Sequence, residues 1–253
     1  MAPTAPVANR LIGALPRTDR QRFLASCTPV DLGFAEVLAE PDDRIRHVYF
    51  PTRSLISLVM AIDDGGANLE VGMVGDEGML GIPLVFGVDA SRLRSIVQGS
   101  GTALRMEARQ FRRELARSPA LLRLMQRYVY VVLSQLAQTA ACTRFHVVEA
   151  RLARWLLMTQ DRAHSKQFHV THEFLAFMLG VRRVGVTKAA TALQTARLIR
   201  YHRGNVMVLD RAGLEAASCG CYAADKAIYT QVMGSGPVST RASERDAVGK
   251  EPV

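Results

Sequence analysis

The chain has 253 residues, is 49% hydrophobic and carries a formal net charge of +9. This length and hydrophobic content suffice for one large domain or two ordinary ones. A basic balance indicates a polyanionic partner, most often nucleic acid or an acidic membrane surface. The N-terminus lacks a basic region followed by an apolar run, and four cysteines in a chain this long do not indicate a disulfide scaffold. We therefore expect a soluble cytoplasmic protein without a membrane partner.

Short strands dominate the predicted N-terminal part, which follows a loose arm and extends to residue 117. Examples are HVYFP at 47–51 and ANLEVGMV at 67–74, and Asp64-Gly65 between two apolar runs is a strong hairpin signal. Strands this short and this frequent are typical of an antiparallel sandwich or barrel. We predict that residues 1–117 form the arm and an antiparallel β-domain.

A single long helix is predicted over residues 118–146, because Ser118 can cap it with Pro119 at its first position. Apolar residues along it repeat at spacings of three and four, which is typical of a dimer seam. The seam consists of Leu122, Met125, Val129, Val132, Leu136 and Thr139. A second apolar set consists of Leu121, Leu124, Tyr128 and Val131. Two apolar faces suit a helix that packs on its own domain and on a partner copy, although an ordinary core helix shows the same periodicity.

The remaining sequence divides into a basic segment and a tail. Residues 147–222 have the pattern of several helices with a β-hairpin around Gly204. From 147 to 218 the chain has 11 Lys+Arg against 5 Asp+Glu, so a net charge of +6 lies in this short segment. Residues 223–253 become rich in Gly, Ser, Pro and charge, and we predict that this tail is mostly disordered.

The stretch LAFMLGVRRVGVTKAATAL at 175–193 has the pattern of a helix-turn-helix. Thr171 is a plausible N-cap for its first helix. Ala176 is small where two helices would cross, and Gly180 follows four residues later, where a tight turn needs positive φ or lacks room for a side chain.

One face of the second helix is predicted to read DNA. Arg183, Val184, Thr187 and Lys188 share this face, and Glu173 is the sole acid between residues 164 and 209. A solvated charged face normally mixes signs, whereas arginine near a helix N-terminus suits insertion into the major groove. An arginine there can bond guanine O6 and N7, which gives about 1–3 kcal/mol of discrimination. Thr187 can contact a thymine methyl or a phosphate, and Lys188 a phosphate.

No pattern in the sequence indicates catalysis, so we expect a protein that is not an enzyme. No HExxH, GxSxG or Walker pattern is present, and we find no nucleophile–base pair. An iron–sulfur cluster typically needs four thiolates, and the N-terminal region offers Cys27 alone. Cys219 and Cys221 are either a weak metal pair or two small thiols on a terminal helix. We favour the second alternative and predict no metal site and no firmly assigned cofactor.

These features together resemble the Crp/Fnr family of bacterial transcription regulators, over roughly residues 12–222. The resemblance implies an α+β fold: an N-terminal antiparallel β-roll similar to cyclic-nucleotide-binding domains, a long dimerisation helix, and a C-terminal winged helix-turn-helix. It also implies a homodimer, double-stranded DNA and RNA polymerase as partners, and a hinge near residues 142–147.

Residue by residue, the resemblance places Arg183 on the family's guanine-reading arginine. Val184 falls where many members have a glutamate that reads the complementary strand, which implies a different half-site. Arg182 and Thr171 match positions that contact the DNA backbone. His202, with Arg203 beside it, falls on the wing.

The effector pocket matches the family less well. Cyclic-nucleotide-binding members use a Gly-Glu pair and an Arg-Ser pair. Here Glu77-Gly78 and Ser91-Arg92 occupy roughly these places, the latter in reversed order. A phosphate site needs a fixed cation and converging donors. A cyclic nucleotide, another effector and no effector therefore stay open as alternatives.

The sequence thus predicts a dimeric regulator that binds a near-palindromic site with the helix starting near Arg182 in the major groove. The alternative is a small-molecule sensor that acts mainly through protein partners, with vestigial DNA binding. The uncompensated basic helix favours the regulator.

Overall fold

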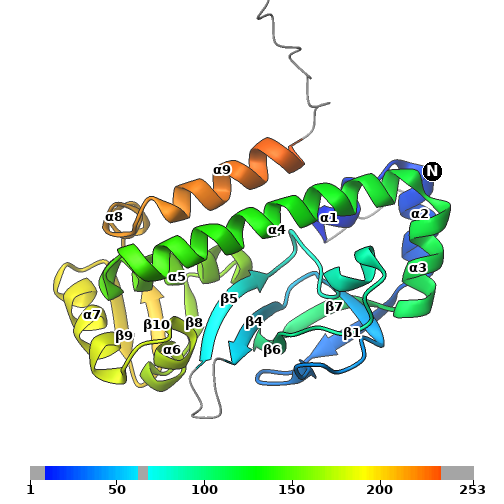
Figure 1. Ribbon diagram of the computed structural model, residues 1–253. Coiled ribbons are helices and arrows are strands. Elements are labelled where there is room, and N and C mark those ends of the chain that lie inside the picture. Colours follow the sequence, from blue (N-terminus) through cyan, green and yellow to red (C-terminus); the bar gives the residue numbers. More distant parts are fainter. Residues whose placement is uncertain (1–8, 62–67, 235–253) are drawn as a thin grey trace, which may run out of the picture.

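The computed structural model describes residues 9–61 and 68–234. Its longest element is helix α4 (Pro119–Phe145), which runs across the whole molecule (Figure 1). The N-terminal β-domain and the C-terminal winged domain lie side by side against one side of α4, and helix α9 (Cys221–Met233) lies along another. The fold is the α+β arrangement that the sequence predicts.

The N-terminal domain contains two short helices, α1 (Arg10–Gly13) and α2 (Arg17–Ala25), and two antiparallel sheets. One sheet has the order β1–β7–β3, formed by Thr28–Leu32, Gly101–Glu107 and His47–Pro51. The other has the order β2–β6–β4–β5, formed by Val37–Ala39, Arg94–Gly99, Leu55–Ala61 and Asn68–Val74. Strands β4 and β5 pair antiparallel, as predicted, while the Asp64-Gly65 turn lies outside the described residues.

Helix α3 (Ala108–Arg117) and the 3-10 helix η1 (Ile82–Phe86) interrupt a region in which we expected short strands. Phe111 of α3 is fully buried, and its ring lies 6.5 Å from that of Phe23 and 6.3 Å from that of Phe50. An aromatic cluster at the end of the β-domain therefore anchors α3, and such tertiary packing is not visible in a strand-like pattern.

Helix α4 begins as predicted: the Ser118 hydroxyl accepts a hydrogen bond from the Leu121 amide at 3.1 Å, and Pro119 is the first helical residue. Within its own chain the helix buries residues of both predicted apolar faces. The second apolar set, Leu121, Leu124, Tyr128 and Val131, is buried, but so are Met125 and Val129 of the predicted seam. The apolar side chains that α4 leaves exposed include Leu122, Tyr130 and Leu133.

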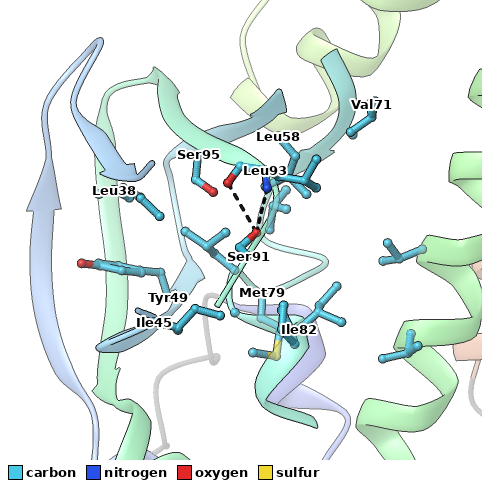
Figure 2. Close-up of a pocket in the computed structure, with 18 of the residues that line it drawn as sticks. Leu38, Ile45, Tyr49, Leu58, Val71, Met79, Ile82, Ser91, Leu93 and Ser95 are labelled. Carbon is cyan, nitrogen blue, oxygen red and sulfur yellow. Dashed lines mark hydrogen bonds between the residues drawn. The ribbon is translucent and has the colours of Figure 1, made fainter. Parts of the chain in front are cut away.

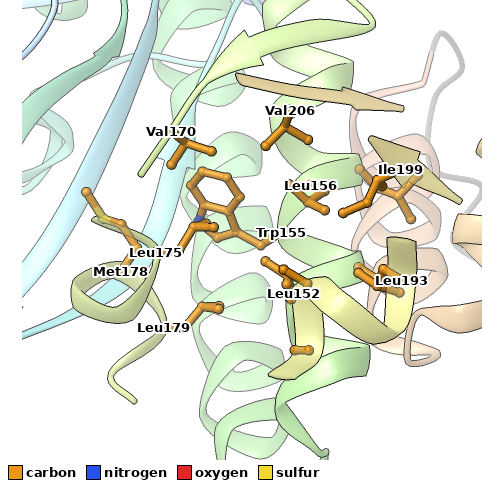
Figure 3. Close-up of a cluster of buried hydrophobic side chains, with 14 of the residues drawn as sticks. Leu152, Trp155, Leu156, Val170, Leu175, Met178, Leu179, Leu193, Ile199 and Val206 are labelled. Carbon is orange, nitrogen blue, oxygen red and sulfur yellow. The ribbon is translucent and has the colours of Figure 1, made fainter. Parts of the chain in front are cut away.

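The winged domain consists of helices α5 (Val148–Ala163), α6 (His172–Leu179), α7 (Arg183–Thr195) and α8 (Arg211–Ala217) with a small sheet. That sheet has the order β8–β10–β9, formed by Gln167–His169, Asn205–Val208 and Ile199–His202. Trp155 lies at the centre of its core, among Val170, Leu175 and Met178 (Figure 3). The same core includes Leu55 of β4, so the two domains are packed together.

Glu70 of β5 lies where the two domains meet. Its Oε1 accepts a hydrogen bond from Trp155 Nε1 at 3.0 Å. Burial raises the pKa of Glu70 to about 7, because a desolvated carboxylate is disfavoured. The interdomain contact thus includes a carboxyl group that gives up its proton near neutral pH.

The predicted disorder of the tail is wrong for residues 223–233, which belong to α9. Asp225 of α9 forms a buried ion pair with Arg154 of α5 at 2.6 Å, and the Tyr229 hydroxyl donates to the Glu77 carbonyl at 3.0 Å. The Gly, Ser and Pro content that suggested disorder begins only near residue 234. Residues 235–253 lie outside the described residues. In the described part of the chain, no helix has the length and apolarity that a membrane crossing requires.

Candidate nucleic-acid interface

Helices α6 and α7 form the helix-turn-helix that the sequence predicts. The Thr171 hydroxyl caps α6 by accepting a hydrogen bond from the Phe174 amide at 3.1 Å. Gly180 ends α6 with a φ of +61°, which a side chain would strain, and a Cβ there would also lie 3.1 Å from Leu69. The turn is therefore fixed by its backbone conformation and by its packing on β5.

The outward face of α7 carries the predicted contact residues. Arg182 is the N-cap of α7 and is exposed, as are Arg183, Val184, Thr187 and Lys188. The opposite face, with Val186, Ala190 and Leu193, is buried. None of the basic side chains of this outward face forms an ion pair with another described residue. A basic helix end that leaves its charges unpaired is suited to bind a polyanion.

Strands β9 and β10 form the wing, which places two more predicted residues beside α7. His202 and Asn205 face each other across a two-residue turn made by Arg203 and Gly204. Both turn residues have positive φ, +47° and +80°, as a type I′ hairpin requires. His202 and Arg203 are exposed at this tip, so the wing adds a second basic contact point.

His172 connects the wing to α7, a role that sequence reasoning missed. Its ring stacks on Tyr201 of β9 with centroids 4.5 Å apart and an interplanar angle of 6°. Its Nδ1 lies 3.1 Å from the Thr187 hydroxyl, which also donates to the Arg183 carbonyl at 3.1 Å. Burial lowers the pKa of His172, and the positive charge of Arg183 lowers it further. The hydroxyl of Thr187 is thus engaged within the protein.

The predicted effector residues have separate partners in this structure. Glu77 accepts a hydrogen bond from Arg162 Nε at 2.7 Å, and a Cβ at Gly78 would collide with the hydroxyl of Tyr128. Ser91 bonds locally to the backbone of Leu93. Arg92 has an 81% exposed side chain and pairs with Asp42. Glu77 therefore joins the β-domain to α5 in this structure, whereas Ser91 lies in the lining of a cavity.

A cavity of about 450 Å³ lies between the second sheet and α4. Figure 2 shows that mostly apolar side chains surround it, including Leu58, Met79 and Leu93, with Tyr49, Ser91 and Ser95 among the polar ones. The seam residues Val132 and Leu136 also line it. Thr139, the last seam residue, accepts a hydrogen bond from Arg154 at 3.2 Å. Most of the predicted dimer seam is thus directed at its own chain: Met125 and Val129 are buried, Val132 and Leu136 face the cavity, and Leu122 is the exposed member.

Comparison with known proteins supports this architecture. The sequence of residues 150–217 matches the protein family described as the Crp-like helix-turn-helix domain. No curated protein matches the sequence. The fold is similar to that of the c-di-GMP-responsive global regulator CLP of Xanthomonas campestris, with a TM-score of 0.63 and 17% identity over 76% of this chain and 99% of that one.

Two further solved structures are similar over comparable lengths. FixK2 of Bradyrhizobium japonicum has a TM-score of 0.65 and 13% identity, covering 76% of this chain and 98% of that one. A CRP-family transcriptional regulator of Thermus thermophilus has a TM-score of 0.62 and 21% identity, covering 75% of this chain and 96% of that one. Residues 150–217 are therefore a Crp-like helix-turn-helix domain, in a chain that has the Crp/Fnr fold.

Proposed function

We propose that this protein is a sequence-specific transcription regulator that binds a near-palindromic DNA site as a homodimer. The observation that carries the proposal is the unpaired basic surface of α7 and the wing, supported by the rigid turn at Gly180. In this arrangement the N-terminal end of α7 enters the major groove, and action at a promoter makes RNA polymerase a partner.

Each contact residue then has a distinct task. Arg183 reads a guanine through a bidentate hydrogen bond. Arg182, Lys188 and the wing residue Arg203 contact phosphates, which fix the register without reading sequence. Val184, whose side chain is 60% exposed, offers an apolar contact where a glutamate would accept a hydrogen bond. The half-site should therefore favour a thymine methyl near this position.

For the dimer interface we propose the exposed apolar stripe of α4, Leu122, Tyr130 and Leu133, in place of the seam that periodicity suggested. These positions are spaced so that they share one side of the helix, and they are 36%, 57% and 58% exposed. Sedimentation should show a dimer for the wild type and a monomer for Leu133→Glu, because a charge buried in an apolar interface is costly. Unchanged sedimentation of the variant would contradict this interface.

For the cavity beside α4 we propose an uncharged apolar effector. Its lining is mostly apolar, and the arginines that reach it, Arg44 and Arg46, are exposed rather than fixed within it. Its contact with Val132 and Leu136 places a ligand against α4. An uncharged apolar dye should bind there, and Val132→Trp should weaken its binding by filling the space. Displacement of the dye by cyclic AMP would contradict this ligand class.

Selection of bound duplexes from a random DNA pool tests the main proposal. We expect a two-fold-symmetric site, with half-sites about one helical turn apart, to be enriched by the wild type. Arg183→Ala should relax the preference at one base pair in each half-site. Arg109→Ala, which removes an exposed arginine of α3 in the β-domain, is the matched control and should leave the site unchanged.

The competing hypothesis of vestigial DNA binding makes a different prediction for salt. Phosphate contacts release counterions, so log K should fall linearly with log salt with a slope of about −0.9 for each phosphate contacted. Lys188→Ala should reduce the magnitude of that slope by about one per subunit. A flat salt dependence, together with no enriched site, would reject the regulator in favour of a sensor that acts through protein partners.

A further inference from the structure

Four metal-ligating side chains meet where α4 ends and α9 begins. Cys142 lies in the last turn of α4, His146 is the C-cap of the same helix, and Cys219 and Cys221 flank the start of α9. The three thiols are buried. The four ligand atoms all lie within 4.8 Å of one another, although the two pairs are more than 70 residues apart in the chain.

The distances within this cluster match the edges of a metal-centred tetrahedron. The Sγ atoms of Cys142 and Cys219 are 3.5 Å apart, and Sγ of Cys221 lies 3.5 Å from Nδ1 of His146. A tetrahedral zinc site, with Zn–S of about 2.3 Å and Zn–N of about 2.0–2.1 Å, has S···S edges of about 3.8 Å and S···N edges of about 3.6 Å. Small shifts would therefore bring all four atoms to bonding distance around one central ion.

The ligand set selects the metal. Three thiolates and an imidazole suit Zn²⁺, and four protein ligands are typical of a closed structural zinc site, since no position is left for water or a substrate. An iron–sulfur cluster places several iron and sulfide atoms between its thiolates, for which a group spanning 4.8 Å is too compact. We propose that Cys142, His146, Cys219 and Cys221 form a structural Zn²⁺ site.

The surroundings of the cluster provide an outer shell of the kind that metal sites need. Gln138, one turn before Cys142, donates a hydrogen bond from Nε2 to Sγ of Cys221 at 3.0 Å. Zn²⁺ with three thiolates and a neutral imidazole has a net charge of −1. Arg151 and Arg154 of α5 lie within electrostatic range of the Cys142 thiol and can offset that charge. Outer partners like these orient ligands and tune affinity.

The position of the site gives the ion a structural consequence. Helix α4 ends at Phe145 and α5 begins at Val148, so His146 lies in the connection between the long helix and the winged domain. Cys219 and Cys221 lie where the winged domain ends in the sequence and α9 begins. The ion would therefore hold the winged domain in one orientation relative to α4. This inference does not depend on the proposed DNA binding, because metal binding can be measured without DNA.

Titration of the full chain with Co²⁺ tests the site. Protein stripped of metal and kept reduced should bind one equivalent of Co²⁺, with intense thiolate-to-cobalt charge-transfer absorption and the d–d bands of a tetrahedral ion, and Zn²⁺ should displace it. Cys219→Ser and His146→Ala should each weaken Co²⁺ binding at least about 100-fold, since a ligand matters more than an outer partner. Cys27→Ser is the matched control, because Cys27 lies outside the cluster, and it should bind Co²⁺ as the wild type does.

A second variant distinguishes coordination from simple packing. Gln138→Leu keeps a side chain of similar size but removes the hydrogen bond to Cys221, and we expect about 10–100-fold weaker Co²⁺ binding with unchanged stoichiometry. If the ligand variants fail to fold, wild-type protein still decides the matter: metal binding should raise its melting temperature, and a chelator should lower it again. Reduced wild type with four titratable thiols that binds no Co²⁺ would overturn the proposal. So would a Cys142–Cys219 disulfide that forms in the presence of Zn²⁺ as readily as in its absence.

Discussion

Two groups of arginines in the winged domain show how position decides what a charge does. Arg182 and Arg183 at the start of α7 are exposed and form no ion pair with a described residue, so they stay available for a partner. Arg154 and Arg162 of α5 are largely enclosed, with side chains 8% and 11% exposed, and form ion pairs with Asp225 at 2.6 Å and Glu77 at 2.7 Å. In the proposed function the exposed group serves recognition, whereas the second group joins α5 to α9 and to the β-domain. The net charge of the winged domain therefore does not show which of its arginines are available to a partner.

The sharpest way to separate the two groups is to remove a buried arginine. Arg162→Ala leaves the buried Glu77 with only the more distant Arg10, at 3.9 Å, and we expect the free energy of unfolding to fall by about 3 kcal/mol. Arg92→Ala, at an exposed ion pair with an 81% exposed side chain, is the control and should change it by less than about 1 kcal/mol. Urea unfolding measures both. Equal effects of the two variants would mean that burial does not distinguish these arginines. The double variant Arg162→Met, Glu77→Gln should recover much of the lost free energy of unfolding.

The buried carboxyl at the same domain contact predicts how stability depends on pH. The folded protein keeps the proton of Glu70 up to about pH 7, whereas the unfolded chain releases it near 4.5. Between these values the folded state binds more protons, so this group makes stability fall as pH rises, by up to about 3 kcal/mol at pH 8. Glu70→Gln keeps an acceptor for Trp155 and should remove that slope in unfolding experiments from pH 5 to 8. A slope that persists in the variant would assign the pH dependence to other groups.

The exposed group could be predicted from the sequence because local rules govern it. Gly180 at a tight turn, Thr171 at a helix start and the spacing of Arg183 and Lys188 on one face each depend on a few neighbouring residues. The same locality made the antiparallel strands and the start of α4 at Ser118 predictable. Such features need no knowledge of what packs against them.

The buried group could not be predicted because its partners are distant in the chain. Glu77 lies 85 residues from Arg162. The local pattern Glu77-Gly78 suggested a ligand site and gave no sign that the carboxylate accepts a hydrogen bond from Arg162 of α5. Likewise, the periodicity of α4 identified apolar faces but not which one the β-domain and α9 cover. The contact between Cys142 and Cys219 was also unpredictable, because these residues are distant in the chain. Cys219 and Cys221 become part of a four-residue cluster only through the tertiary fold.

The exposed arginines should differ from each other in DNA binding. Arg183→Ala should reduce affinity for the selected site by about 1–3 kcal/mol per base contact and have a smaller effect on random DNA. Arg182→Ala should weaken binding to both DNAs alike and reduce the salt slope, because phosphate contacts carry no sequence information. Fluorescence anisotropy at several salt concentrations distinguishes the two patterns. Parallel losses on both DNAs for Arg183→Ala would contradict a base-reading role.

The smallest expected change in DNA affinity concerns His172, a partly buried residue beneath the exposed surface of α7. His172→Phe keeps the ring stacked on Tyr201 but removes the hydrogen bond to Thr187, and a neutral hydrogen bond contributes about 0.5–1.5 kcal/mol. Thr187→Val removes the same bond from the other side. If His172 acts by holding Thr187 in place, the double variant should bind the selected site no more weakly than the weaker single variant, because both changes remove one interaction. Additive losses would show that His172 and Thr187 act separately, and the exposed surface would then be independent of the packing beneath it.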